Sequence, residues 1–277
     1  MFSEKCFFTD DTVMTIAVAD ALLDGGTADD FIDSMEKFGR LYPNAGYGGR
    51  FGSWVHSDER EPYNTWGNGS AMRVSPCGWF AESLEEAEVL AERSVSVTHN
   101  HPEGIKGAQA TAAAIYLARI GKSQAEIRDY IESKYEYNLS RTLDEIRPGY
   151  RFNETCQETV PEAIIAFLES KGFEDAIRNA ISLGGDSDTL AAITGSIAEA
   201  AYGITERFEG MGYVNPPGST LSKAYHFIGD TIAAVINAWI DSDRPISYQA
   251  KKPDSAKSFS KVKMIKTDIR FSEKHYA

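Results

Sequence analysis

Cysteine is scarce in this sequence, with three residues in 277. Cys6, Cys77 and Cys156 lie too far apart for the disulfide framework of a small secreted domain, and no CxxC pair suggests a zinc knuckle. Basic residues are also few, because 28 Lys and Arg stand against 41 Asp and Glu, for a formal net charge of -13. Affinity for nucleic acid comes mostly from basic side chains, so we expect no nucleic-acid partner.

Long apolar runs are missing as well. No stretch of about 18 apolar residues occurs, which excludes an ordinary membrane-spanning helix. The amino terminus lacks the charged segment, apolar stretch and cleavage site of a secretory signal. Together with the small number of cysteines, this predicts a cytoplasmic protein without a membrane partner.

Segments that alternate apolar and polar residues, the pattern of half-buried strands, are rare too. Apolar residues recur instead at helical spacing. The segments predicted as helices are 13–23, 28–42, 83–94, 105–120, 123–134, 158–170, 173–182, 188–202 and 221–241. We therefore predict a single all-α domain over residues 1–243.

Two regions lie outside this helical pattern. Residues 43–78 are rich in glycine, aromatic and polar residues and are predicted to be dominated by loops, where binding residues concentrate. Residues 244–277 form a lysine-rich extension, for which a short strand pair, a flexible tail and a segment docked on a partner are all open.

Acidic residues precede two of the predicted helices. Thr9, Asp10 and Asp11 stand before the first, and the sequence GGDSDT, residues 184–189, stands before the helix at 188–202. Helix capping explains both patterns. The alternative is a divalent cation, because aspartate and threonine oxygens are hard donors and adjacent carboxylates need a cation, a proton or solvent to neutralise them.

Glycine-rich loops and two histidines are further candidates. In the segments GYG, residues 46–48, and NGS, residues 68–70, the glycines would let backbone amides approach a phosphate or a ribose, or simply serve a connecting loop. His99 and His101 stand just before a helix that Pro102 can begin. They could flank an anion at that helix terminus or be ordinary hydrogen-bonded loop histidines.

Taken together, the motifs TDDT, GYG, GNGSAMR, THNHPEG and GGDSDTLAAITGSIAEAAYG occur in an order that resembles the ADP-ribosylglycohydrolase family, which includes the dinitrogenase reductase activating glycohydrolases. The likeness runs from about residue 8 to residue 204, and the last motif is its most specific part. It implies an all-helical fold and a hydrolase that cuts ADP-ribose from ADP-ribosylated protein or ADP-ribosyl-arginine, with ADP-ribose as the product.

The resemblance also implies a site. Two Mg²⁺ or Mn²⁺ ions would activate a water, held by the metal ligands Thr9, Asp10, Asp11, Asp186, Asp188 and Thr189. The catalytic carboxylates would be Asp10, Asp11 and Asp186. The substrate-binding residues would be Gly46, Tyr47 and Gly48 near the adenosine, Thr65, Trp66, Asn68, Gly69 and Ser70 along the diphosphate and distal ribose, and His99 or His101 at the diphosphate.

The sequence departs from the family pattern at its amino end. In the family, a helix with glycine and aspartate precedes the TDDT motif, and an acidic residue near the metals follows that helix, whereas here only eight residues stand before the motif. The resemblance therefore implies a chain shortened at its front. Two alternatives stay open: a non-catalytic member that binds ADP-ribose or has a structural role, and a hydrolase whose leaving group is serine or a small metabolite.

Overall fold

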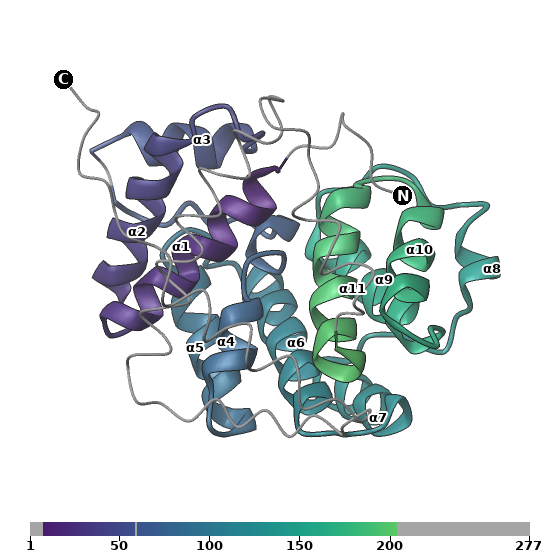
Figure 1. Cartoon of the computed structure of the whole chain (residues 1–277). Helices are drawn as coiled ribbons and strands as arrows, with labels where there is room; N and C mark the ends of the chain where they lie inside the picture. The colour runs from purple at the N-terminus through teal and green to yellow at the C-terminus, as the bar shows by residue number, and fades with distance from the viewer. Residues whose placement is uncertain (1–7, 59, 204–277) are drawn as a thin grey trace, which may run out of the picture.

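The computed structural model describes residues 8–58 and 60–203. This part of the chain is helical and contains no strand, which confirms the predicted all-α fold (Figure 1). Its elements are α1 (Asp10–Asp24), α2 (Ala28–Leu41), α3 (Gly49–His56), the 3₁₀ turn η1 (Asn68–Ser70), α4 (Ser75–Phe80), α5 (Leu84–Ser96), α6 (Pro102–Arg119), α7 (Gln124–Tyr135), α8 (Leu143–Ile146), α9 (Cys156–Leu168), α10 (Phe173–Leu183) and α11 (Ser187–Tyr202). The helix expected at 221–241, the boundary at residue 244 and the extension lie outside the described residues.

The eight helices predicted within the described residues are all present, with ends set by local capping. In α2 the Thr27 hydroxyl accepts from the Asp30 amide and the Asp30 side chain accepts from the Thr27 amide, a capping box that fixes the first turn. Helix α6 begins at Pro102, the start that the proline suggested, and not at residue 105, where the apolar pattern begins; His101 caps it by accepting from the Glu103 amide.

Most of the described residues in 43–78 are non-helical, as predicted, but the sequence analysis missed the short helices among them. This segment contains α3, η1 and α4. In α3 the side chains of Phe51, Trp54 and Val55 are buried on one face, at the spacing of a helix, although the glycines around them suggest a loop. The short helix α8 was also missed, since its four residues are too few to show a periodic pattern.

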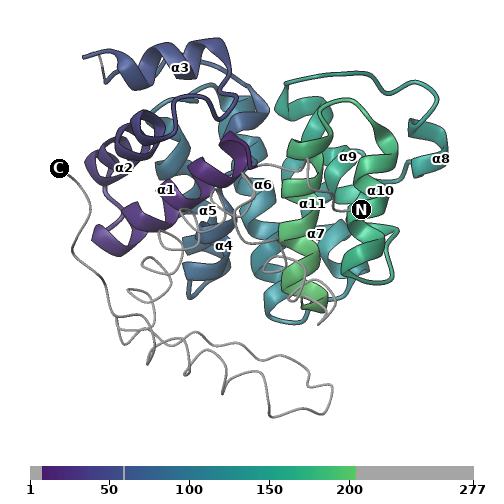
Figure 2. The ribbon, with the colours of Figure 1, turned by 45° about the horizontal axis from the view of Figure 1, so that its top comes forward.

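The buried apolar side chains form two clusters that meet at α6. One cluster joins α1 to α5, and the other joins α7 to α11. Alanines of α6 belong to both, with Ala108 and Ala112 in the first and Ala110 and Ala113 in the second. Because alanine and glycine leave little bulk on α6, neighbouring helices approach it closely on both sides, and α6 lies centrally between the two groups (Figures 1 and 2).

None of the described helices combines the length and the apolar character needed to cross a membrane.

Candidate functional site

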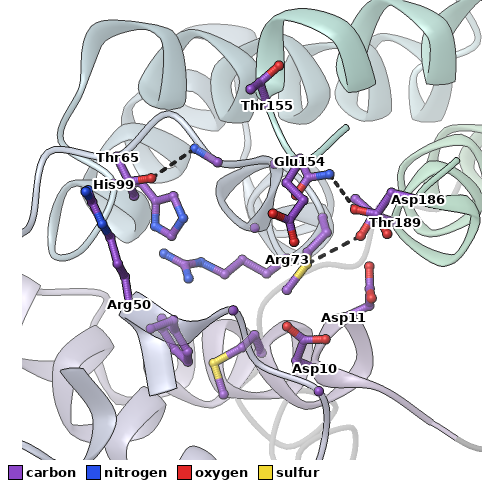
Figure 3. Close-up of a pocket in the computed structure, with 18 of the residues that line it drawn as sticks. Asp10, Asp11, Arg50, Thr65, Arg73, His99, Glu154, Thr155, Asp186 and Thr189 are labelled. Atoms are coloured by element: carbon purple, nitrogen blue, oxygen red, sulfur yellow. Dashed lines mark hydrogen bonds between the residues drawn. The ribbon is translucent and has the colours of Figure 1, made fainter. Parts of the chain in front are cut away.

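A cavity of about 690 Å³ opens where the amino-terminal ends of α1 and α11 meet the loops 63–69 and 152–155 (Figure 3). Its lining residues come both from the part of the chain with α1 to α5 and from the part with α7 to α11, so the cavity forms only when these two parts pack together. The predicted site residues in its wall are Asp10, Asp11, Gly46, Gly48, Thr65, Trp66, Asn68, Gly69, His99, Asp186, Asp188 and Thr189. The structure thus places most of the predicted site residues around one space.

The two acidic patches reach this cavity from opposite ends of the described chain. Asp10 and Asp11 stand in the first turn of α1, while Asp186 directly precedes α11 and Asp188 is in the first turn of α11. Gly184 and Gly185 have positive φ angles of 72° and 65°, a conformation that favours glycine and turns the chain from α10 into α11. The sequence motifs therefore become neighbours only through folding.

Hydrogen bonds hold two of these carboxylates in place. Thr9 Oγ1 donates to Asp11 Oδ2 at 2.8 Å, and Asn68 Nδ2 donates to Asp186 Oδ2 at 2.7 Å. The other oxygen of Asp11, Oδ1, is buried and has no hydrogen-bond partner among the described residues. A buried carboxylate oxygen without a partner is unfavourable unless a ligand satisfies it.

The carboxyl groups of the two acidic patches have raised pKa values, because burial and mutual repulsion disfavour their ionised forms. Burial, followed by repulsion from Asp188 and Asp186, raises the pKa of Asp10 to about 6. Burial and then repulsion from Asp10 and Asp188 raise the pKa of Asp11 to about 6, and burial with the nearby Asp188 raises the pKa of Asp186 to a similar value. A bound cation would relieve this repulsion.

The donors in this wall suit a hard divalent cation. The two acidic patches offer carboxylate and hydroxyl oxygens, which is the set that Mg²⁺ or Mn²⁺ prefers. Within residues 8–58 and 60–203, no three acidic, histidine or cysteine side chains converge tightly enough to bind one ion as they stand. The unpartnered Asp11 Oδ1 and the raised pKa values are nevertheless features that a cation between the patches would satisfy.

The loop that carries Thr65 to Ser70 is fixed by main-chain contacts with the segment before α9. The Asn68 amide donates to Glu154 O at 2.8 Å, and the Cys156 amide donates to Trp66 O at 2.9 Å. Gly104 on α6 lets this loop approach, because a Cβ there would lie 2.8 Å from Thr65 O. Backbone pairing therefore positions the loop rigidly over the cavity.

Four predicted site residues do not line the cavity. Ser70 is fully buried and donates to Gly104 O at 2.9 Å, so it supports the loop from below. Tyr47 packs on Phe51 and lines a separate open groove beside α3. Thr9 holds Asp11 from outside the cavity, and His101 caps α6 against the Trp66 ring, with 5.0 Å between the ring centroids.

Other residues in the wall were missed by the sequence analysis. Arg50, Tyr63 and Arg73 line the cavity, as do Phe152 and Glu154. Arg73 had a signal, since it stands in the largely apolar stretch AMRV, where a charged side chain needs a reason. Phe152 and Glu154 had none, because they reach the cavity only through the pairing of their loop with residues 66–68.

The sequence profile of the family described as ADP-ribosylglycohydrolase matches residues 3–207. The chain belongs to the ADP-ribosylglycohydrolase family. ADP-ribosylhydrolase ARH3 of Homo sapiens is 27% identical over 266 residues, which cover 74% of this chain and 73% of the human protein. ADP-ribosylarginine hydrolase Tri1 of Pseudomonas putida is 29% identical, with 72% of this chain and 59% of that protein covered.

A solved structure described as an "ADP-ribosylglycohydrolase-related protein complex" has the same fold as this ADP-ribosylglycohydrolase family member. Its TM-score is 0.62, its sequence is 24% identical, and the match covers 84% of this chain and 81% of that one. The fold expected from the motifs is therefore confirmed by structure and by family.

Proposed function

We propose that this ADP-ribosylglycohydrolase uses two Mg²⁺ or Mn²⁺ ions to remove ADP-ribose from ADP-ribosylated protein side chains, with arginine as the preferred linkage. The observation that carries the proposal is the meeting of the acidic patches of α1 and α11 in the wall of one cavity of about 690 Å³. That volume lies within the usual range of small-molecule sites, about 300–1,000 Å³. The names of the human and Pseudomonas relatives agree with such a reaction.

In this proposal the ions are held by Asp10, Asp11, Asp186 and Asp188, with the hydroxyls of Thr9 and Thr189 completing the set of oxygen donors. The ions would supply positive charge that orients the ribose hydroxyls and lowers the pKa of a water near the anomeric carbon. Thr9 lies outside the cavity wall and bonds to Asp11, so its part would follow a rotation of its side chain.

The remaining steps fall to side chains of the chain itself. A carboxylate among Asp10, Asp11 and Asp186 would accept the proton as the water attacks and the side-chain nitrogen departs. Burial raises the pKa of Asp10 and of Asp11 to about 6 without a cation, and bound ions would favour the ionised carboxylates, which are the form that can accept a proton. Asn68 would keep Asp186 oriented through its hydrogen bond of 2.7 Å.

Glu154 supports arginine as the linkage. Its side chain lies in the cavity wall, between Arg73 and Asp186 in Figure 3, and it belongs to neither acidic patch. A guanidinium carries a positive charge and a planar set of donors that match a carboxylate. A leaving serine hydroxyl has neither property, so a glutamate at this position would discriminate between them.

The experiment compares the wild type and three variants on ADP-ribosyl-arginine and ADP-ribosyl-serine peptides, with Mg²⁺, with Mn²⁺ and with EDTA, and measures released ADP-ribose. Asp188→Asn is expected to lower kcat/KM by about 100-fold or more, because a lost metal ligand removes several kcal/mol of transition-state stabilisation. Asp129→Asn, on the exposed face of α7, is the control and is expected to match the wild type.

Glu154→Gln is expected to lower kcat/KM about tenfold on the arginine peptide and not on the serine peptide, as one charge-assisted hydrogen bond predicts. Turnover in EDTA, or full activity of Asp188→Asn, would contradict the metal assignment. ADP-ribose binding without release from any peptide would identify a non-catalytic member. The relation to the dinitrogenase reductase activating type and the cytoplasmic location stay predictions.

A further inference from the structure

A buried arginine without an acidic partner lies in the wall of the cavity. Arg73 is 1% exposed, and no carboxylate forms an ion pair with it in the described part of the chain. Its Nη2 donates to Thr98 Oγ1 at 2.7 Å, and its Nε is buried without a hydrogen-bond partner. The Phe51 ring, whose centroid is 5.6 Å from the guanidinium carbon, compensates this charge only in part. Burying a charge without an acidic partner is unfavourable, which indicates that Arg73 has a role in the site.

The Thr98 hydroxyl connects Arg73 to His99. A guanidinium can only donate, so Thr98 Oγ1 accepts from Arg73 and has one proton of its own to give. Its two possible acceptors are His99 Nδ1 at 2.8 Å and Val95 O at 3.4 Å. The shorter distance is that of a good hydrogen bond and the longer one is marginal, which directs the proton to His99 Nδ1.

An imidazole that accepts at Nδ1 carries its proton on Nε2 when it is neutral. His99 is 5% exposed, and burial followed by the positive charge of Arg73 lowers its pKa well below the ordinary value. The groups that face it are the Arg73 guanidinium and the Tyr63 ring, 5.7 Å away between centroids. The ring is therefore neutral at physiological pH.

His99 Nε2 faces the glycine loop at the cavity. A Cβ built on Gly69 would lie 3.4 Å from this nitrogen, and one on Gly67 would lie 3.6 Å from it. Nε2 has no hydrogen-bond partner among the described residues. The two glycines thus leave room beside an N–H group that has nothing to donate to within the protein.

We propose that Arg73 and Thr98 are positioning residues that fix His99 as the Nε2–H tautomer, so that a neutral ring donates one hydrogen bond to an anionic phosphate oxygen bound beside Gly67 and Gly69. The identity of the ligand rests on the proposed function, but the tautomer is a property of the free protein. The arrangement gives a directed donor on a neutral ring, while Thr98 joins that ring to the fixed positive charge of Arg73 in the same wall.

The first test is the tautomer of His99 in the free wild-type protein, read from the nitrogen shifts and proton couplings of its ¹⁵N-labelled imidazole and assigned with His99→Gln. The expected state is Nε2–H. Thr98→Val removes the hydroxyl at nearly constant volume and is expected to give a mixture of tautomers, whereas Thr98→Ser keeps the hydroxyl and is expected to keep the wild-type state.

The second test measures the affinity of the same proteins for ADP-ribose by calorimetry. Thr98→Val is expected to raise Kd about tenfold, the effect of losing one hydrogen bond to a charged group, and Thr98→Ser is expected to stay within about twofold. Urea unfolding of each variant confirms that the folded protein is compared. Thr98→Ser, which keeps the hydroxyl, separates the effect of the hydrogen bond to His99 from a general loss of packing.

An Nδ1–H tautomer in the wild type overturns the proposal, and so does Thr98→Val with unchanged tautomer and unchanged Kd. The tautomer of His99 could change in Thr98→Val while neither the wild type nor any variant binds ADP-ribose. That result would support the role of Arg73 and Thr98 in fixing the tautomer and would overturn the proposed function instead. The two failures are therefore distinguishable.

Discussion

Replacing Asp11 with asparagine is expected to stabilise the metal-free protein and to weaken the proposed metal site. Asp11 is 7% exposed, and its Oδ1 has no hydrogen-bond partner among the described residues. Burial, then repulsion from Asp10 and Asp188, makes its charge unfavourable in the folded state. An asparagine keeps a carbonyl oxygen for the Thr9 hydroxyl and removes the charge.

The size of the effect follows from the pKa shift. The pKa of Asp11 rises from 3.8 to about 6, and each pKa unit corresponds to about 1.4 kcal/mol, so the charge costs about 3 kcal/mol at pH 7. The variant does not recover the whole of this energy, because the asparagine still buries one polar atom without a hydrogen-bond partner. We expect the free energy of unfolding in EDTA at pH 7 to rise by about 1–2 kcal/mol.

The pH dependence has a definite sign. Below pH 3.8 the carboxyl is protonated in both states and contributes nothing, and between 3.8 and about 6 the folded state holds more protons than the unfolded state. Its contribution therefore lowers stability as the pH rises through that window, and the loss is complete above pH 6. The difference between Asp11→Asn and wild type should grow from pH 4 to pH 7.

The assay is urea unfolding at several pH values, in EDTA and in saturating Mg²⁺. A metal that binds only the folded state at 100 times its Kd stabilises it by about 2.7 kcal/mol, and Asp11→Asn should gain much less. Asp129→Asn on the exposed face of α7 is the matched control and should stay within about 0.5 kcal/mol of wild type in every condition. The reasoning is refuted if Asp11→Asn is less stable than wild type in EDTA at pH 7, or if Mg²⁺ stabilises both equally.

Three further predictions concern the loop and the helix contacts. Gly69→Ala would place a methyl group 3.4 Å from His99 Nε2, so we expect about a tenfold weaker affinity for ADP-ribose in calorimetry with little change in urea stability, and unchanged affinity would contradict the assigned space. Gly107→Ala would put a Cβ 2.7 Å from Cys156 Sγ, and overpacking of α6 against α9 should lower the unfolding free energy by about 1–3 kcal/mol, measured in urea. Tyr135→Phe removes a donor 2.6 Å from the buried Glu88 carboxylate and should lower stability by about 1.5–3 kcal/mol; a neutral result would show that the bond between α5 and α7 contributes nothing.

The sequence predicted the long helices because their apolar stripes are strong local signals, as in α2, where Phe31, Met35 and Phe38 are buried on one face. It did not predict α3, since the glycines around Phe51 and Trp54 suggest a loop and the helix is stabilised by burial of those rings. The local composition of this segment therefore predicted a loop, whereas packing of its aromatic side chains stabilises a helix.

The candidate site was predictable where its residues form compact motifs. The acidic patches of α1 and α11 were found in this way, and the structure places them together. Arg73 and Glu154 could not be placed, because their position depends on contacts between distant segments, such as the amide of Asn68 donating to Glu154 O at 2.8 Å. A pattern that extends over a few residues carries no information about such pairings.

The helix ends explain why the fold tolerates an acidic wall at all. Asp10 and Asp11 in α1, and Asp186 and Asp188 in α11, stand at amino-terminal ends, where the partial positive charge of a helix amounts to about half an elementary charge. Two such ends neutralise only part of four carboxylates, which is why burial still raises the pKa of Asp10 and of Asp11 to about 6. The negative charge that remains attracts a divalent cation more strongly than a monovalent one, because Coulomb attraction grows with the charge of the ion. The two helices hold the carboxylates, which are ligands that divalent cations prefer, in fixed positions. The same clustering of carboxylates that destabilises the protein in EDTA is therefore what would give it affinity for a divalent metal.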